Sequence, residues 1–426
     1  MRKRIVILGG GTGGTLVANR LRRELGHDAA DIVVVDQDDQ HVYQPGLLFV
    51  PFGLADPAEL IRPRHRQLHA GIGFRQAGVE QVDLGAQSVV LDDGGTLGYD
   101  VLIVATGAHL LPAETEGLAE AMAAGTAFTF YTPAGAAALQ DALARFEGGR
   151  IAVNVVDMPI KCPVAPLEFC FLADWYFHER KIRGQVELTY VTPLDGAFTK
   201  PVASAELSGL LRDKDVSLVT EFNTGSVSSS GLTSWDDRQV PCDLAVVIPL
   251  HGGADYVSRS EGLGDELGFI PVDVHTLQSK AAPNVFAIGD ATGVPASKAG
   301  SVTHFEGEVL VENVRRFLAG QPLDASFDGH ANCFIETGFG KALLIDFNYE
   351  VEPMGGHYPG PVGLPLLRQS RLNHLGKLMF QSFYWHGLLP GRDIPGIGSA
   401  MPRRGKPSLP ADGAPDTATA GHATAG

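Results

Sequence analysis

The chain has 426 residues, enough for two or more domains at roughly 100–200 residues each. Hydrophobic residues make up 44% and charged residues 19%, and 52 glycines indicate a globular protein rich in tight turns. The net charge of -16 argues against a nucleic-acid partner, and also against attachment to an anionic membrane by charge alone.

The N-terminal apolar run covers only residues 5–8, which is too short for a signal peptide. No window approaches the roughly 18 apolar residues of a membrane-spanning helix. We therefore expect a protein that stays on the cytoplasmic side, where four cysteines do not predict a structural disulfide scaffold. We predict no metal site, and a homo-oligomer is left open.

The first 36 residues follow a strand–helix–strand pattern. Residues 4–8 and 32–35 are apolar runs typical of buried strands, and residues 15–25 have helical spacing between them. Further buried strands are predicted at 101–107 and 284–290. A second α/β segment lies between these two, with strands at 150–156, 186–191 and 244–248 and helices at 166–180 and 203–212.

These patterns predict an α/β fold with two Rossmann-like dinucleotide-binding domains and a C-terminal membrane-associating segment. We expect a discontinuous FAD-binding domain at 1–110 and 270–330, and a second Rossmann-like domain at 111–269. A C-terminal segment at 331–400 begins with a predicted hairpin. Residues 401–426 are rich in Pro, Ala, Gly, Thr and Asp and are expected to be a disordered tail.

A glycine fingerprint, G-x-G-x-x-G, joins the first strand to the first helix. Its glycines are Gly9, Gly11 and Gly14, and Asp36 ends the next strand. These glycines permit a tight turn, close approach to a pyrophosphate and close helix–strand packing, while the acid accepts hydrogen bonds from a ribose. The pattern predicts a dinucleotide site but does not separate FAD from NAD.

Two other segments favour FAD. The run that ends in Ala105, Thr106 and Gly107 resembles the Ala-Thr-Gly segment of flavoproteins with two dinucleotide domains. The run that ends in Gly289 and Asp290 resembles their C-terminal motif, whose aspartate binds the flavin ribitol. The three motifs occur in the expected order, so we predict FAD as the cofactor.

The second Rossmann-like unit carries no glycine fingerprint. Its first strand runs into a loop with Pro159, Cys162, Pro163 and Pro166, and proline lacks the N–H that would help to hold a phosphate. A nicotinamide nucleotide is therefore not expected there, and the electrons must come from another donor.

The chain resembles the sulfide:quinone oxidoreductase family over roughly residues 4–390. The segments that carry the resemblance are 43–46, 162–169, 289–292, 295, 297–300, 304–306 and 333–334. The resemblance implies that Cys162 and Cys333 form a disulfide or polysulfide bridge on one face of the flavin. Sulfide attacks this bridge, two electrons pass into the flavin, and zero-valent sulfur is built up as polysulfide.

Neighbouring residues have roles that follow from the same resemblance. Glu168 is a candidate general base toward hydrogen sulfide, or alternatively a solvated helix acid. Lys161 and Lys298 are candidates for lowering the pKa of a cysteine, and Lys298 belongs to the cofactor-binding segment. His304 is either a core histidine or a proton carrier on the quinone side.

The cysteine pattern departs from many family members, which have a third cysteine before the pair. No cysteine precedes Cys162 here, which puts a three-cysteine mechanism and covalent flavin attachment in doubt. Cys170 and Cys242 are interpreted as small buried hydrophobic residues.

The electrons are expected to leave to a membrane quinone. Residues 362–389 are apolar and aromatic with basic residues alongside, which is typical of an interfacial helix, of a packing helix or of a dimer face. The resemblance places Lys377 and Phe380 near the quinone, and Phe339 is a second aromatic candidate. The membrane contact would then be peripheral.

Three other functions remain open. A type II NADH:quinone dehydrogenase is opposed by the missing second fingerprint. A flavocytochrome-type sulfide dehydrogenase is opposed by the missing signal peptide. A non-catalytic flavin- or sulfur-binding protein would be indifferent to loss of Cys162 or Cys333.

Overall fold

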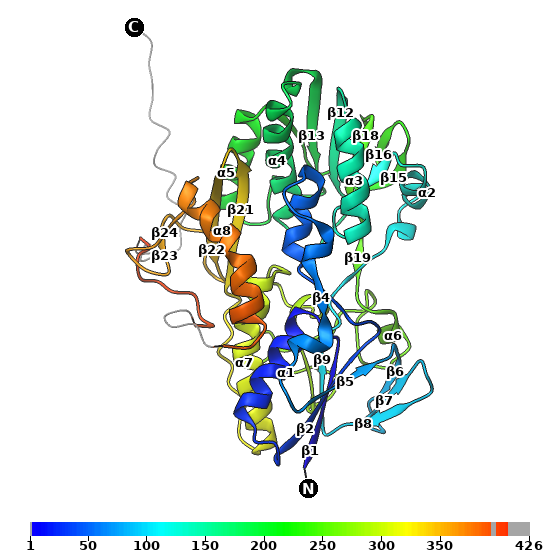
Figure 1. The fold of residues 1–426 in the computed structure, drawn as a ribbon, viewed down its shortest axis with the longest axis vertical. Coiled ribbons are helices and arrows are strands. Elements are labelled where there is room, and N and C mark those ends of the chain that lie inside the picture. Colours follow the sequence, from blue (N-terminus) through cyan, green and yellow to red (C-terminus); the bar gives the residue numbers. More distant parts are fainter. Residues whose placement is uncertain (1, 393–397, 408–426) are drawn as a thin grey trace.

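The computed structural model describes residues 2–392 and 398–407, and the predicted tail lies outside the described residues from 408 onward. The chain forms two α/β lobes, one above the other in Figure 1, each built on a five-stranded parallel sheet. The prediction of two Rossmann-like sheets is therefore confirmed. The domain boundaries stay a prediction.

The first sheet has the strand order β20-β9-β1-β2-β5. The strands are β1 (Lys3–Leu8), β2 (Ala30–Asp36), β5 (Ile72–Gln76), β9 (Val101–Val104) and β20 (Val285–Ala287). All neighbours pair in parallel, and β9 and β20 are buried throughout. Because both faces of a parallel sheet are covered, its strands β1, β9 and β20 contain apolar runs, whereas the edge strand β5 is mostly exposed.

The carboxyl ends of these strands share one edge of the sheet. Leu8 is in register with both Val35 and Val104, and Ala287 is in register with Val104. The residues that follow the strands therefore meet at this edge, where open α/β sheets bind ligands. Helices α1 (Thr12–Glu24) and α7 (Gly300–Leu318) cover one face and pack closely at Gly307, which faces Leu16.

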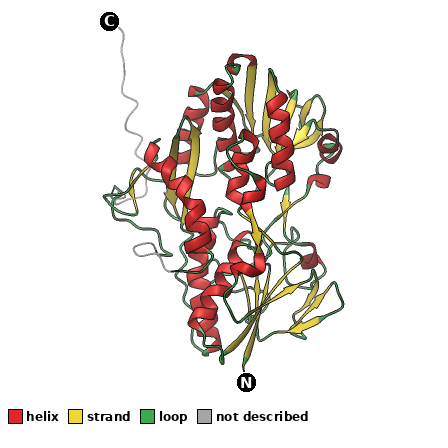
Figure 2. Cartoon of the chain, viewed as in Figure 1, coloured by secondary structure: helices red, strands yellow, loops and turns green. Residues whose placement is uncertain are grey.

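The second sheet has the order β11-β18-β12-β13-β14, again all parallel. Its strands are β11 (Ala127–Phe128), β12 (Gly149–Val155), β13 (Val186–Val191), β14 (Val216–Val219) and β18 (Leu244–Ile248). Helices α3 (Pro133–Arg145), α4 (Ala165–Glu179) and α5 (Pro201–Asp213) accompany it (Figure 2). Helix α4 is buried on nearly all sides in its first ten residues, so its sequence is apolar rather than amphipathic.

Short elements complete the two lobes. The helices are α2 (Leu118–Ala123) and α6 (Asp255–Ser258). The strands are β3 (Gln40–Val42), β4 (Ile61–Pro63), β6 (Val79–Asp83), β7 (Ser88–Leu91), β8 (Thr96–Gly98), β10 (His109–Leu110), β15 (Thr224–Ser228), β16 (Gly231–Ser234), β17 (Gln239–Pro241) and β19 (His251–Gly252). Strands β10 and β19 pair where the chain passes between the lobes.

The C-terminal part begins with the predicted hairpin, formed by β21 (Ala331–Gly338) and β22 (Lys341–Phe347). Strands β23 (Gly356–Tyr358) and β24 (Leu364–Leu366) and helix α8 (Arg371–Phe383) follow, and α8 continues into a π-helical turn, Tyr384–Leu388. Within the described ranges, no helix combines the length and apolar character needed to cross a membrane. A membrane-associating role for this part stays a prediction.

Candidate active site

The glycine fingerprint adopts the geometry that its three roles require. Gly9 has a φ of 90°, and a Cβ there would lie 2.4 Å from the carbonyl oxygen of Ala105. A Cβ on Gly14 would lie 1.8 Å from the Gly9 oxygen, so Gly14 permits close helix–strand packing. A Cβ on Gly11 would meet nothing within 4 Å, which leaves its backbone open to a ligand.

A cavity of about 910 Å³ begins at this loop and reaches the second lobe. Its walls contain most of the predicted site residues, namely Gly9, Gly11, Asp36, Thr106, Gly107, Cys162, Glu168, Gly289, Asp290, Lys298, Lys377 and Phe380. Gln44, Pro45, Leu47 and Leu48 also contribute to the wall. The structure therefore joins the two halves of the predicted nucleotide site and one cysteine in a single space.

Asp36 is held at the loop end of the cavity. Its carboxylate accepts a hydrogen bond from the Gly10 N–H at 2.7 Å and pairs with Arg64 at 3.0 Å. Burial raises the pKa of Asp36, although the Arg64 guanidinium opposes this. Arg64 also binds Asp38 and the Gln40 carbonyl, and its side chain is 9% exposed. Sequence reasoning missed Arg64, which no local motif marks.

Lys298 connects the flavin motif to the first cysteine. Its ammonium donates to the carbonyls of Asp290 and Thr292 at 2.9 and 2.8 Å, and its own carbonyl accepts from the Cys162 N–H at 2.7 Å. Burial raises the pKa of Asp290, while Lys298 and Lys161 act in the opposite direction. Both lysines therefore favour the ionised form of the Asp290 carboxyl.

Cys162 lies at the start of α4 in a left-handed conformation, with a φ of 45°. Its carbonyl accepts from the Tyr131 hydroxyl at 3.2 Å and from the Ala165 N–H at 2.9 Å. Burial, together with Glu168, raises the pKa of the Cys162 thiol to about 12, and Lys377 is the cation that opposes them. Lys161 and Lys298 are not among the main causes of this shift and act on Asp290, so the predicted lowering of a cysteine pKa by these two lysines stays a prediction.

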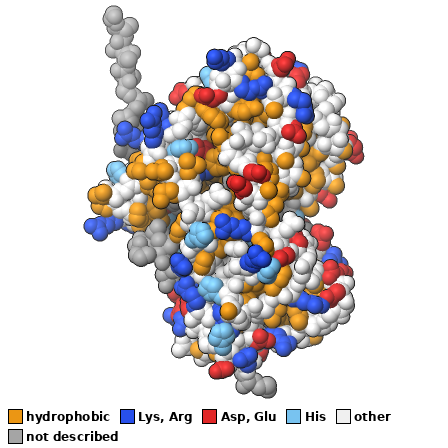
Figure 3. All heavy atoms as spheres, in the orientation of Figure 1, with side chains coloured by type: hydrophobic (Ala, Val, Ile, Leu, Met, Phe, Trp, Pro, Cys, Tyr) orange, Lys and Arg blue, Asp and Glu red, His pale blue; other side chains and the backbone are white. Residues whose placement is uncertain are grey.

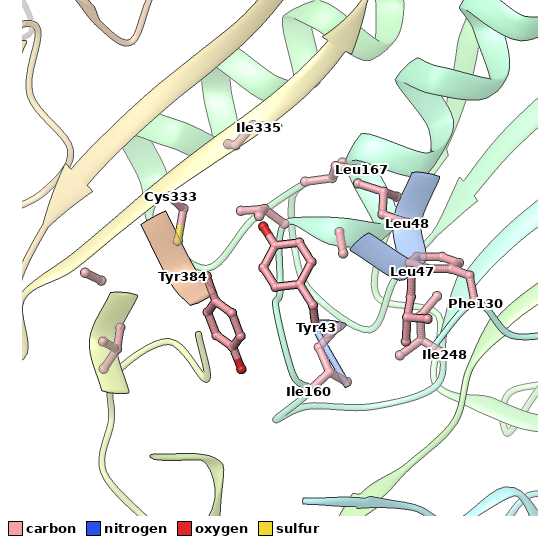
Figure 4. Close-up of a cluster of buried hydrophobic side chains, with 14 of the residues drawn as sticks. Tyr43, Leu47, Leu48, Phe130, Ile160, Leu167, Ile248, Cys333, Ile335 and Tyr384 are labelled. Atoms are coloured by element: carbon pink, nitrogen blue, oxygen red, sulfur yellow. The ribbon is translucent and has the colours of Figure 1, made fainter. Parts of the chain in front are cut away.

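Cys333 lies on β21 and is 8% exposed. Burial raises the pKa of its thiol, and Cys162 is the next largest cause, so the two sulfur atoms are within electrostatic reach. Figure 4 shows the Cys333 thiol pointing from its strand toward Tyr384 and Tyr43. All four cysteines are free thiols, and Cys170 and Cys242 are buried in apolar clusters, as interpreted from the sequence.

Four ionisable side chains meet where α8 approaches the cysteine region: Glu168 from α4, Glu336 from β21, and His374 and Lys377 from α8. Glu168 is 1% exposed, so it is not a solvated helix acid. It forms an ion pair with Lys377 and accepts from the Glu336 N–H at 2.6 Å. His374 binds the Glu336 carboxylate at 2.8 Å. Burial raises the pKa values of both glutamates, and Lys377 opposes this at each.

Tyr384 closes the cavity from the C-terminal side and was not predicted. Its hydroxyl lies 2.7 Å from His41 Nε2 and 2.8 Å from Thr12 Oγ1, and His41 Nδ1 lies 3.1 Å from the Gly10 carbonyl. Burial, together with Arg64, lowers the pKa of His41 to about 3, so the ring is neutral near pH 7. Through Thr12 and His41, the Tyr384 hydroxyl therefore links the C-terminal segment to the glycine loop by hydrogen bonds.

Phe339 is not brought together with the other predicted residues. It is 46% exposed and lines a second cavity with Asp174, His178 and Lys214, away from Lys377 and Phe380. Its ring lies under the Lys214 ammonium at 4.8 Å. His304 is buried on α7, which leaves its two interpretations open.

The two parallel sheets and the single fingerprint define a dinucleotide-binding oxidoreductase with a thiol-lined cavity. A family model described as pyridine nucleotide-disulphide oxidoreductase matches residues 3–304, and the chain belongs to this family. The open backbone at Gly11 and the acids Asp36 and Asp290 in the cavity wall fit FAD. The prediction of FAD is confirmed at the level of the family.

The chain is also similar to proteins named sulfide:quinone oxidoreductase. It is 27% identical to the mitochondrial enzyme of Dictyostelium discoideum over 91% of this chain and 86% of that protein. It is 26% identical to that of Mus musculus over 82% of this chain and 79% of that protein. The solved structure of the sulfide:quinone oxidoreductase from Aquifex aeolicus has a TM-score of 0.76 at 18% identity, covers 92% of both chains and shares the fold. The predicted resemblance is confirmed.

Proposed function

We propose that the protein oxidises sulfide to zero-valent sulfur with Cys162 and Cys333 and passes the electrons through FAD to a membrane quinone. The observation that carries this proposal is the position of Cys162. It lines the same cavity as the glycine fingerprint, within electrostatic reach of the buried Cys333. The similarity to sulfide:quinone oxidoreductases supports the same substrates.

The cysteine chemistry begins from the oxidised pair, joined by a disulfide. Hydrosulfide attacks one sulfur, the S–S bond breaks, and the products are one cysteine persulfide and one thiolate. The persulfide and the thiolate then join as a trisulfide, which releases one proton and two electrons. FAD, when bound, supplies the two-electron acceptor for this oxidation.

Glu168 is the proton acceptor that this scheme needs. It lines the cavity and is among the groups that raise the pKa of both cysteines, and both observations support this role. Burial raises the pKa of the Glu168 carboxyl toward neutral pH, and a general base is most effective when its pKa is near the working pH. Lys377 stabilises the thiolate that is released at Cys162 because it is the cation that lowers that pKa.

The quinone would enter from the side of α8. Lys377 and Phe380 line the cavity from this helix, and its outer face carries Leu372, Leu375, Leu378 and Met379, which are 51–63% exposed. Figure 3 shows hydrophobic side chains with Lys and Arg at their edge in the region of α8, β23 and β24. An apolar helix face flanked by cations is suited to the surface of a bilayer. The side of the membrane stays a prediction.

The experiment compares two electron donors under anaerobic conditions. Purified protein with FAD is mixed with sulfide or with NADH, and flavin absorbance is followed in a stopped-flow instrument. We expect rapid bleaching by sulfide and at least about a tenfold slower reaction with NADH, a difference of roughly 1.4 kcal/mol in barrier. Bleaching by NADH and not by sulfide would favour a type II NADH:quinone dehydrogenase instead.

A further inference from the structure

A row of alternating acids and bases leads from the cavity to the surface. Glu168 and Lys377 line the cavity, Glu336 follows with a side chain 2% exposed, and His374 reaches the surface with a side chain 29% exposed. The four residues come from α4, α8 and β21. We call this row the acid–base row.

The contacts along the acid–base row are direct at both ends. Lys377 forms an ion pair with Glu168, and its ammonium also donates to the Phe334 carbonyl at 3.3 Å. His374 Nδ1 contacts both oxygens of the Glu336 carboxylate, at 2.8 and 3.1 Å. His374 and Lys377 are three residues apart on α8 and so share one face of the helix. Glu336 contacts His374 and is within electrostatic reach of Lys377.

We propose that His374 and Glu336 carry protons between bulk solvent and Lys377 at the cavity wall. This inference rests on the proposed function and adds a proton route to it. Reduction of a quinone to a quinol consumes two electrons, which the reduced cofactor supplies, and two protons. Lys377 would give each proton from Nζ, and Glu336 would restore it from the imidazole of His374, which takes the next proton from water.

The groups around Glu336 suit this task. Burial raises the pKa of the Glu336 carboxyl and favours its neutral, proton-holding form, while Lys377 and His374 act in the opposite direction. Histidine is the side chain whose ordinary pKa lies nearest to neutrality, and His374 is the member of the row that meets solvent. Lys377, in contrast, is kept charged: burial lowers its pKa, but Glu168 and Glu336 outweigh burial.

The test separates the two half-reactions in the full-length holoenzyme. Sulfide-dependent bleaching of the flavin is measured first. Reoxidation of dithionite-reduced enzyme by decylubiquinone is measured separately, with a pH-indicator dye to follow proton uptake. The variants are His374→Gln and Glu336→Gln. His386→Gln, which changes an exposed histidine on the neighbouring π-helical turn, is the matched control.

We expect reoxidation and proton uptake to slow by at least about tenfold in His374→Gln and Glu336→Gln. Bleaching by sulfide should stay within about twofold of the parent rate, because proton delivery enters only the second half-reaction. Added imidazole should restore reoxidation in His374→Gln and leave the His386→Gln rate unchanged.

Equal slowing of both half-reactions, or failure of imidazole to restore His374→Gln, would overturn the inference in favour of a structural role. Unchanged reoxidation in both variants would overturn it as well. If sulfide fails to bleach the parent enzyme but decylubiquinone still reoxidises it, the proposed sulfide chemistry fails while the proton route is still tested by the second half-reaction.

Discussion

Lys377 on α8 forms an ion pair with Glu168 on α4, although 209 residues separate them in the sequence. Their side chains are 12% and 1% exposed. This ion pair holds α8 of the C-terminal part against α4 of the second lobe, near Cys162. The C-terminal part is therefore a wall of the cavity that Cys162 also lines.

Replacing Lys377 by methionine should destabilise the protein by about 3–5 kcal/mol, because Glu168 would keep a buried charge without a partner. Urea unfolding measures the change. The double variant Lys377→Met with Glu168→Gln should recover part of the loss, since the unpaired buried charge of Glu168 is then removed. A double variant whose loss equals the sum of the single losses would contradict the coupling.

Arg64→Met should weaken FAD binding by about tenfold or more, roughly 1.4 kcal/mol. Arg64 pairs with Asp36 at 3.0 Å and fixes the carboxylate that faces the cavity. Without this partner, burial raises the pKa of Asp36 further and its hold on a ribose weakens. Titration of the apoprotein with FAD measures the affinity. Arg66→Met, at an exposed position nearby, is the control, and equal loss in both would point to a general charge effect.

Tyr384→Phe should cost about 1–3 kcal/mol of stability because it leaves a buried nitrogen of His41 without its partner. Denaturant unfolding of the variant checks this value. Combining it with His41→Phe should cost less than the sum of the two single changes, since the removed groups contact each other. Full additivity would show that the hydroxyl does not bind His41.

Glu306 should make stability fall as pH rises. Burial is the main cause that raises its pKa from 4.5 to about 7. Between these values the folded protein holds a proton that the unfolded chain has lost, so unfolding becomes easier as pH increases, by up to about 3 kcal/mol. Glu306→Gln should flatten the profile between pH 5 and pH 7.5, measured by urea unfolding, relative to the exposed control Glu261→Gln. Parallel profiles for the parent and Glu306→Gln would contradict the assignment.

The sequence predicted the features that local patterns encode. Gly9, Gly11 and Gly14 could be assigned roles because a glycine fingerprint between a strand and a helix fixes its own backbone. Thr106, Gly107, Gly289 and Asp290 follow buried strands, and parallel strands bring their ends to one edge of the sheet. Cys162 and Glu168 followed from the family resemblance, and the structure places both in the cavity wall.

Features that depend on distant contacts were missed or misplaced. Arg64, Tyr384 and the Glu336–His374 contact have no signal in the neighbouring sequence, since each joins residues 26 to 343 positions apart. Lys161 is next to Cys162 in the chain, yet it faces Asp290 because the loop carries it to the flavin motif. Phe339 was chosen for its nearness to Cys333, but the turn between β21 and β22 carries it to the other cavity.

The most direct test of the central claim replaces Cys162 and Cys333 in turn by serine and measures anaerobic bleaching of the flavin by sulfide. Cys162→Ser and Cys333→Ser should retain FAD and lose sulfide bleaching by at least about 100-fold, while Cys242→Ala, changed in a separate apolar cluster, should react at the parent rate. Unchanged bleaching in either serine variant would contradict a cysteine-pair mechanism and leave that thiol with a structural role.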